Sequence, residues 1–151
     1  MFKIPGIDSY FGGKAASGTY QRIINHIRPH DTLVIPFAGN CAITRAIHWP
    51  GRVLVNDLDT TVIDAWCAAN LGPKLEVFNL PALDFITQAI QSPRFGRIVI
   101  YCDPPYSLDS RKSQREIYRH EMTDRDHEEF LTAVRFSASI ASFQPTPTNA
   151  T

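Results

Sequence analysis

Residues 97–106 read RIVIYCDPPY, and this stretch decides the fold. Residues 97–102 form a largely apolar, β-branched run, which predicts a buried parallel strand. Two consecutive prolines cannot extend that strand, because neither donates a ladder hydrogen bond and each fixes its own φ. The strand must stop at Asp103, which leaves a carboxylate, two carbonyls and the Tyr106 ring at its C-terminal end. In open α/β sheets ligands bind at that end. For this stretch taken alone, the alternative is a strand that ends in a proline turn with Asp103 as a polar cap.

Strands and helices alternate along the rest of the chain, which predicts a parallel sheet with helical crossovers. Strands are predicted at 32–35, 52–56, 75–78 and 97–102, and a possible fifth at 140–143. Helices are predicted at 20–27, 41–47, 61–70, 81–91 and 123–134. Gly72-Pro73 is expected to stop the helix over 61–70, and Thr123 is the expected N-cap of the last helix. The predicted fold class is therefore α/β, with helices on both faces of four to five strands.

Small or acidic residues follow each of these strands. Gly39 lies in the turn after the first strand, and Asp57, roughly 20 residues further on, is placed to bind ribose hydroxyls. Asp59 is the competing candidate for that role. Asp84 follows the third strand, and Asp103 the fourth. Singly, each acid is more simply a helix cap or a surface charge. The series at successive strand ends favours one nucleotide-binding edge.

Asp103, Pro104, Pro105 and Tyr106 resemble the DPPY signature of the amino-methyltransferases, which move a methyl group from S-adenosyl-L-methionine (AdoMet) to an exocyclic amine of a base. The resemblance implies that these four residues are catalytic. The Asp103 carboxylate and a proline carbonyl would accept the two N–H bonds of the amine and hold its lone pair towards the methyl group. Tyr106 would supply the face on which a flipped base stacks.

Other segments resemble the cofactor-binding parts of this family. Residues 36–40, PFAGN, resemble its PFxGxG turn, although Cys41-Ala42 follow where a second glycine is frequent. Asp84 and Phe85 resemble its acid-aromatic pair, which meets the adenine of the cofactor. Residues 10–14, YFGGK, resemble the N-terminal GGK segment of the DNA adenine-N6 methylases, where a lysine and nearby backbone touch the amino-acid end of the cofactor. The cofactor-binding residues implied are Tyr10, Gly12, Lys14, Pro36, Phe37, Ala38, Gly39, Asn40, Asp57, Asp84, Phe85 and Asp103.

The resemblance is to Dam-like and phage-type enzymes and covers residues 8–134. It implies a Rossmann-like domain that transfers a methyl group from AdoMet to the N6 amine of adenine in DNA. The family sheet has seven strands, and beyond Val134 we find no further family resemblance. We therefore expect a methyltransferase domain over 1–134 and an atypical, partly disordered tail over 135–151, as in a truncated or frame-shifted reading. The alternatives are a non-catalytic remnant with residual AdoMet binding, or a guanine-N2 methyltransferase acting on RNA.

Composition and charge set the remaining expectations. The chain has 151 residues, 44% of them hydrophobic and 20% charged, with zero net charge and no apolar run long enough to cross a bilayer. Cys41, Cys67 and Cys102 have no CxxC spacing, so we expect buried, reduced thiols in a cytoplasmic protein without a zinc site.

Four cations follow the DPPY segment, and they are candidates to contact DNA phosphates: Arg111, Lys112, Arg115 and Arg119. A solvated charged loop is the alternative. His120 and His127 are candidates for a metal ligand or general base, but no third ligand has usable spacing, so we expect no metal.

Overall fold

The predicted parallel sheet is present in the computed structural model, which describes residues 4–6, 18–49, 51–105 and 122–141, with side chains up to Arg135. Its strands are β1 (Thr32–Ile35), β2 (Arg52–Asn56), β3 (Leu75–Phe78) and β4 (Ile98–Ile100). All neighbours pair in parallel, in the order β3-β2-β1-β4. The α/β class predicted from the sequence is confirmed for the described residues.

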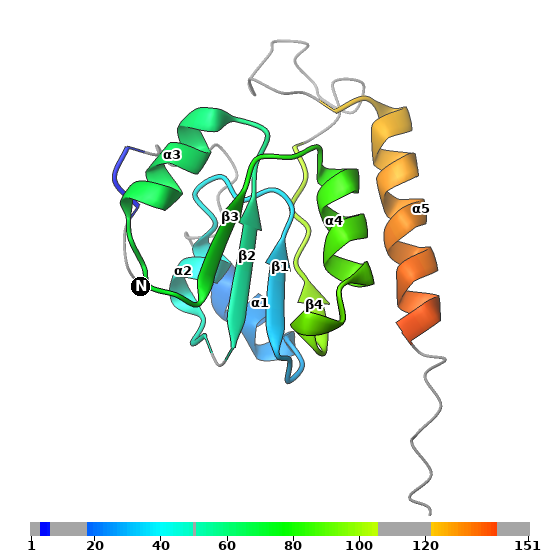
Figure 1. The fold of residues 1–151 in the computed structure, drawn as a ribbon, viewed down its shortest axis with the longest axis horizontal. Helices are drawn as coiled ribbons and strands as arrows, with labels where there is room; N and C mark the ends of the chain where they lie inside the picture. Colours follow the sequence, from blue (N-terminus) through cyan, green and yellow to red (C-terminus); the bar gives the residue numbers. More distant parts are fainter. Residues whose placement is uncertain (1–3, 7–17, 50, 106–121, 142–151) are drawn as a thin grey trace, which may run out of the picture.

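The crossovers are helical, as predicted. The α-helices are α1 (Thr19–His26), α2 (Ala42–Ala46), α3 (Thr60–Ala68), α4 (Ala82–Gln91) and α5 (Asp124–Ala141), and a 3₁₀ turn covers Pro93–Phe95. Figure 1 shows α4 and α5 on one face of the sheet and α1, α2 and α3 on the other. No helix in the described ranges is long and apolar enough to span a membrane.

The core has two halves because strand side chains alternate between the faces of a sheet. Leu33 and Ile35 of β1 pack in the half that contains Trp66 of α3. Val34 packs in the other half, with Phe85 of α4 and Phe130 of α5. Burial of these side chains holds the helices against the sheet and fixes which ends of the strands lie together.

The fourth strand differs from the expected one. Its ladder contains Ile98–Ile100 rather than 97–102, and its three side chains are half-buried rather than buried. The physical reason is its position, because in the described sheet β4 pairs with β1 on one side only. The Tyr101 amide still donates to the Val34 carbonyl at 2.9 Å, so the chain stays beside β1 as it approaches Asp103.

Two helices end elsewhere than expected. Helix α3 ends at Ala68, and Asn70 takes a left-handed φ of 45° before Gly72-Pro73 is reached. Helix α5 starts where expected but continues to Ala141. The possible strand over 140–143 is therefore wrong for Ile140 and Ala141, and residues 142 and 143 lie outside the described residues. The alternating serines have the two-residue period of a strand, but no glycine or proline occurs within Asp124–Ala141 to end the helix.

The cysteines are free, as predicted, but not uniformly buried. Cys41 and Cys102 are half-buried, whereas Cys67 is exposed. The expected burial is therefore wrong for Cys67, which lies on the solvent side of α3, next to the fully buried Trp66.

Candidate functional site

The segments singled out in the sequence meet at one edge of the sheet, because parallel strands in register end together. Ile35 pairs with Val55, Asn56 with Phe78 and Val34 with Ile100. The segments that follow the strands are 79–84 after β3, 57–59 after β2, 36–40 after β1 and 101–105 after β4, in that order across the sheet. This is the edge at which open α/β sheets bind ligands.

The turn over 36–40 is built around its glycine. Gly39 has a φ of 42°, a conformation that an L side chain adopts only with strain. Its amide donates to Oδ2 of Asp57 at 2.9 Å, so the structure brings these two predicted residues into direct contact. The Ala38 amide donates to the Asn56 carbonyl at 2.8 Å. Pro36 and Ala38 are buried, whereas Phe37, Gly39 and Asn40 are half-buried.

Asp57 and Asp59, which the sequence left as competitors for the ribose, have different surroundings. Asp59 is the N-cap of α3, and its carboxylate accepts from the Thr61 amide at 2.9 Å and the Thr61 hydroxyl at 2.7 Å. Both acids are half-buried, but the second oxygen of Asp57 accepts from the Asp59 backbone amide at 2.9 Å. Backbone amides therefore hold Asp57 beside the Gly39 turn, which favours Asp57 over Asp59 as a ligand-binding acid.

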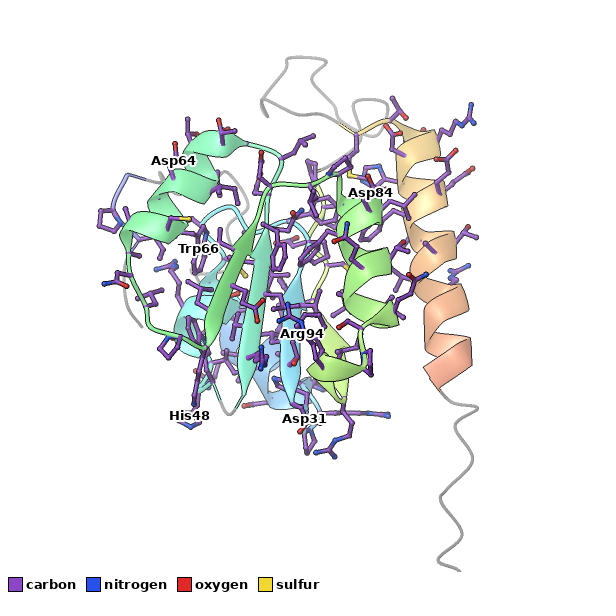
Figure 2. The ribbon with its side chains drawn as sticks, in the orientation of Figure 1. Asp31, His48, Asp64, Trp66, Asp84 and Arg94 are labelled. Carbon is purple, nitrogen blue, oxygen red and sulfur yellow. The ribbon has the colours of Figure 1, made fainter. Side chains whose placement is uncertain are left out.

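Two buried polar side chains that the sequence analysis did not select hold these segments in place. The Trp66 side chain lies between α3 and the sheet (Figure 2), and its indole N–H donates to the Gly39 carbonyl at 2.9 Å. The side-chain nitrogen of Asn56 donates to the carbonyls of Pro36 at 3.1 Å and Leu80 at 3.0 Å. Its side-chain oxygen accepts from the Leu80 backbone amide at 2.9 Å. An asparagine that ends an otherwise apolar strand was the available signal, since buried amides need partners.

The two members of the acid-aromatic pair, Asp84 and Phe85, lie in different surroundings, one in solvent and one in the core. Asp84 is exposed in the first turn of α4, at the strand-end edge, where the helix dipole favours a carboxylate (Figure 2). Phe85 is 2% exposed, and its ring packs on Phe78 with centroids 5.2 Å apart. Of this pair, Asp84 is exposed to solvent, while Phe85 anchors the start of α4.

Asp103 lies at the far end of this edge, beside the Gly39 turn. It is exposed, and Pro104 and Pro105 are half-buried. Burial raises the pKa of Tyr101, and the Asp103 carboxylate raises it further, through its charge and as acceptor of a hydrogen bond from the hydroxyl. Burial also raises the pKa of the Cys41 thiol, and the charge of Asp103 adds to that shift. Asp103 is thus close to Cys41, which follows the 36–40 turn directly, and Tyr101 stays protonated as its donor.

The remaining predicted site residues lie outside the described residues. They are Tyr10, Gly12, Lys14, Tyr106, Arg111, Lys112, Arg115 and Arg119. Their roles stay predictions. Among the residues that are described, no three histidine, cysteine or acidic side chains gather as metal ligands would.

Comparison with known proteins bears on the second half of the chain. A family model described as D12 class N6 adenine-specific DNA methyltransferase matches residues 87–147, less than half of the chain. The matched residues include β4, the Asp-Pro-Pro segment and α5. They also run past Val134, so the expectation that family resemblance stops there is wrong. No curated protein and no solved structure matches the chain. The family match suggests methylation of adenine in DNA, and it supports assignment of this chain to the adenine-specific DNA methyltransferase family.

Proposed function

We propose that this chain binds AdoMet along the strand-end edge and transfers its methyl group to the N6 amine of adenine in DNA. One observation carries the proposal. The Asp-Pro-Pro segment, inside the family match, follows β4, and β4 pairs with β1, whose turn joins Gly39 to Asp57. A base-orienting segment and a nucleotide-binding turn are therefore neighbours.

The order of the strands supports this arrangement. Along the edge the proposed residues come in the order Asp84, Asp57, Gly39, Asp103, because the sheet order is β3-β2-β1-β4. The segments that follow β3 and β1 are two strand spacings apart, roughly 10 Å, and the segment that follows β4 lies one spacing further along the edge. We propose that Asp84 meets the adenine, Asp57 the ribose hydroxyls and the 36–40 turn the amino-acid end. Asp103 then lies beyond the cofactor, where a target amine enters.

The residues present suit such a cofactor. A glycine in the left-handed region lets backbone approach a ligand closely, and carboxylates accept hydrogen bonds from hydroxyl and amino groups. When bound, AdoMet supplies a methyl group activated by a sulfonium. The Gly39 amide and the Asp59 amide hold the Asp57 carboxylate in place for the ribose, so binding loses little side-chain freedom.

The role of Asp103 is to orient the amine. The lone pair of an aromatic amine is delocalised into the ring, so the nitrogen is a poor nucleophile. The Asp103 carboxylate and the Pro104 carbonyl accept hydrogen bonds from the two N–H groups of the amine. These bonds turn the lone pair of the nitrogen towards the methyl group. The Tyr101 hydroxyl, whose pKa is raised by burial and by the Asp103 charge, stays protonated beside that carboxylate. Catalysis then rests on alignment and desolvation rather than on a strong base.

The proposal also includes site residues that lie outside the part of the chain that the structure describes. Tyr106 would stack on the flipped base, and Tyr10, Gly12 and Lys14 would contact the amino-acid end of the cofactor. The four cations Arg111, Lys112, Arg115 and Arg119, which lie within the family match, would contact DNA phosphates.

The test is methyl transfer by the full chain from labelled AdoMet to DNA and, in a parallel assay, to RNA, followed by analysis of the modified nucleoside. We expect N6-methyladenine, and a loss of roughly 100-fold in rate for Asp103→Asn, since an aligned acceptor is removed. Asp64→Asn, which changes an exposed acid on α3, should leave the rate unchanged. Product on guanine in RNA would favour the guanine-N2 alternative. Cofactor binding by calorimetry without any transfer would favour the remnant.

A further inference from the structure

His127, in the first turn of α5, contacts the Asp-Pro-Pro segment directly. Its Nε2 lies 2.9 Å from the Pro105 carbonyl oxygen, across 22 residues of sequence, and the ring is half-buried. A carbonyl oxygen only accepts hydrogen bonds, so this contact is a hydrogen bond when the ring carries a proton on Nε2. This contact joins α5 to the residues that the proposed function uses to orient the amine.

Two consecutive prolines make such a donor necessary. Pro104 and Pro105 have no N–H, so this stretch of backbone cannot tether itself through donors of its own. What it offers are carbonyl oxygens, which accept from water or from a donor elsewhere in the fold, and only the second of these tethers the segment. Among the described contacts, the imidazole of His127 supplies that donor for Pro105.

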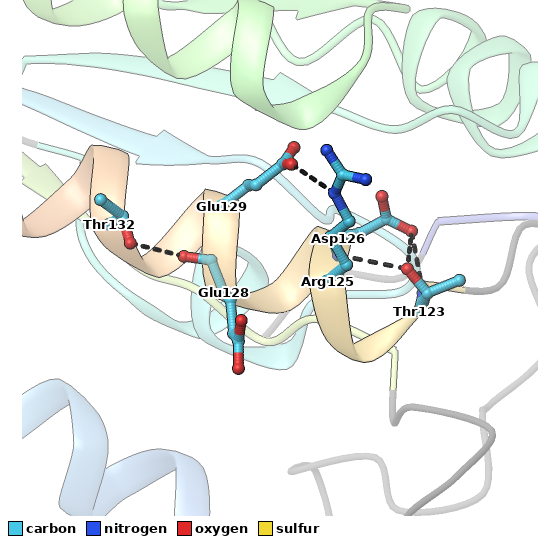
Figure 3. Close-up of polar contacts among 6 residues, drawn as sticks. All are labelled: Thr123, Arg125, Asp126, Glu128, Glu129 and Thr132. Atoms are coloured by element: carbon cyan, nitrogen blue, oxygen red, sulfur yellow. Dashed lines mark hydrogen bonds and ion pairs between the residues drawn. The ribbon is translucent and has the colours of Figure 1, made fainter.

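The imidazole is itself held by the start of α5. Its Nδ1 lies 3.0 Å from the Thr123 carbonyl oxygen, which accepts from the His127 backbone amide at 3.1 Å. A neutral imidazole donates from one nitrogen only, so a ring that donates from Nε2 to Pro105 makes no hydrogen bond from Nδ1, and both nitrogens donate only in the doubly protonated ring. Thr123 and Asp126 cap each other, as Figure 3 shows. The Thr123 amide and hydroxyl donate to Oδ2 of Asp126 at 2.9 and 2.7 Å, and the Asp126 amide donates to the Thr123 hydroxyl at 3.2 Å. These contacts fix the ring relative to the helix.

The same face of α5 also contacts the cofactor turn. Phe130, three residues after His127, is 3% exposed and packs on Phe37 with ring centroids 5.1 Å apart. One helix face therefore touches both Phe37 of the 36–40 turn and Pro105. Since α5 also packs on α4, it holds the 36–40 turn and the Asp-Pro-Pro segment in place relative to each other, and the proposed reaction must align these two segments.

We propose that His127 is a positioning residue: by donating to the Pro105 carbonyl it sets the orientation of Asp103 and Pro104 towards the target amine. This inference rests on the proposed function. Displacement of catalytic groups by about 1 Å costs roughly 100-fold in rate, so loss of one tether is expected to reduce kcat far more than cofactor affinity.

A pair of amide variants tests the role. The side-chain nitrogen of His127→Gln reaches the place of Nε2, whereas that of His127→Asn reaches only the place of Nδ1. We expect His127→Asn to lower kcat at least tenfold with KM for AdoMet within twofold, and His127→Gln to restore most of the rate. His26→Asn is the matched control, because Nδ1 of His26 makes the same local contact, 2.7 Å from the Arg22 carbonyl oxygen, and its ring makes no long-range hydrogen bond to a described residue. Equal rates for the two His127 variants, or an effect confined to KM, would overturn the proposal.

A second measurement does not depend on activity. In the ¹⁵N NMR spectrum of the full chain, the Nε2 proton of His127 should be present and slow to exchange, as a proton bonded to a carbonyl is. A ring without a proton on Nε2 overturns the tether. If the wild-type chain transfers no methyl group, the proposed function fails, while this spectrum still decides whether His127 holds Pro105.

Discussion

At the scale of single residues, the strand-end edge depends on a buried amide. Asn56 is 1% exposed, and its side chain bonds to Pro36 after β1 and to Leu80 after β3. It therefore sets the spacing between the turn that holds Gly39 and the loop that leads to Asp84. A buried side chain with three hydrogen bonds to backbone is a strong constraint, because no water can replace it.

We expect Asn56→Ala to lower the free energy of unfolding by about 3 kcal/mol, since two carbonyls and one amide would stay buried without partners. Urea unfolding measures this loss. Asn79→Ala is the matched control. The Asn79 amide donates to the Asp57 and Leu58 carbonyls at 2.8 and 3.1 Å, but the residue is exposed, so water replaces it at a cost below about 1 kcal/mol. Equal losses would mean that burial at Asn56 is not what matters.

The residues of the site were predictable to different degrees. Gly39 and Asp57 were found because a glycine and an acid directly after strands are a local signal. Asn56, Trp66 and His127 were not found in these roles, because their hydrogen bonds reach across 24, 27 and 22 residues to backbone atoms. Such partners depend on strand order and helix placement, which no local pattern in the sequence contains.

At the scale of elements, the strands were predicted better than the ends of the helices. β1, β2 and β3 have the predicted bounds, because short apolar runs between turn residues leave few alternatives. The predicted end of α5 was wrong because the apolar residues within 135–143 fit both the two-residue period of a strand and the period of a helix. The local pattern does not choose between these periods, and the packing of α5 on α4, with Phe130 on Phe37, depends on the tertiary fold.

The start of α5 offers a prediction at this scale. We expect Thr123→Ala to lower the free energy of unfolding by about 1 kcal/mol and to speed amide hydrogen exchange over residues 124–127, because the cap at the first turn is lost. Thr132→Ala is the control on the same helix. Its hydroxyl donates to the Glu128 carbonyl at 2.8 Å, a bond within the helix that leaves no cap unsatisfied when removed (Figure 3). A loss for Thr132→Ala as large as that for Thr123→Ala would contradict a special role for the cap.

At the scale of the whole molecule, the sheet changes the order in which the chain presents its candidate residues. Along the sequence they come as Gly39, Asp57, Asp84 and Asp103, whereas along the edge Gly39 lies between Asp57 and Asp103. Because β4 pairs with β1 rather than with β3, the proposed cofactor residues Asp84, Asp57 and Gly39 follow one another along the edge. The proposed base-orienting residue, Asp103, is at one end. This arrangement predicts that cofactor binding stabilises β1, β2 and β3 together through the segments that follow them.

Asp57 is the residue that tests this arrangement. At a concentration 100 times its Kd, AdoMet should raise the free energy of unfolding of the wild-type chain by about 2.7 kcal/mol. If Asp57→Asn weakens binding tenfold, the same concentration adds only about 1.4 kcal/mol. Asp64→Asn, an exposed acid on the outer side of α3 (Figure 2), should keep the full effect. Unfolding without AdoMet separates any loss of the Gly39 hydrogen bond from loss of ligand. Equal stabilisation of the two variants by AdoMet would show that the cofactor does not contact Asp57, and that the order of strand ends does not describe its binding.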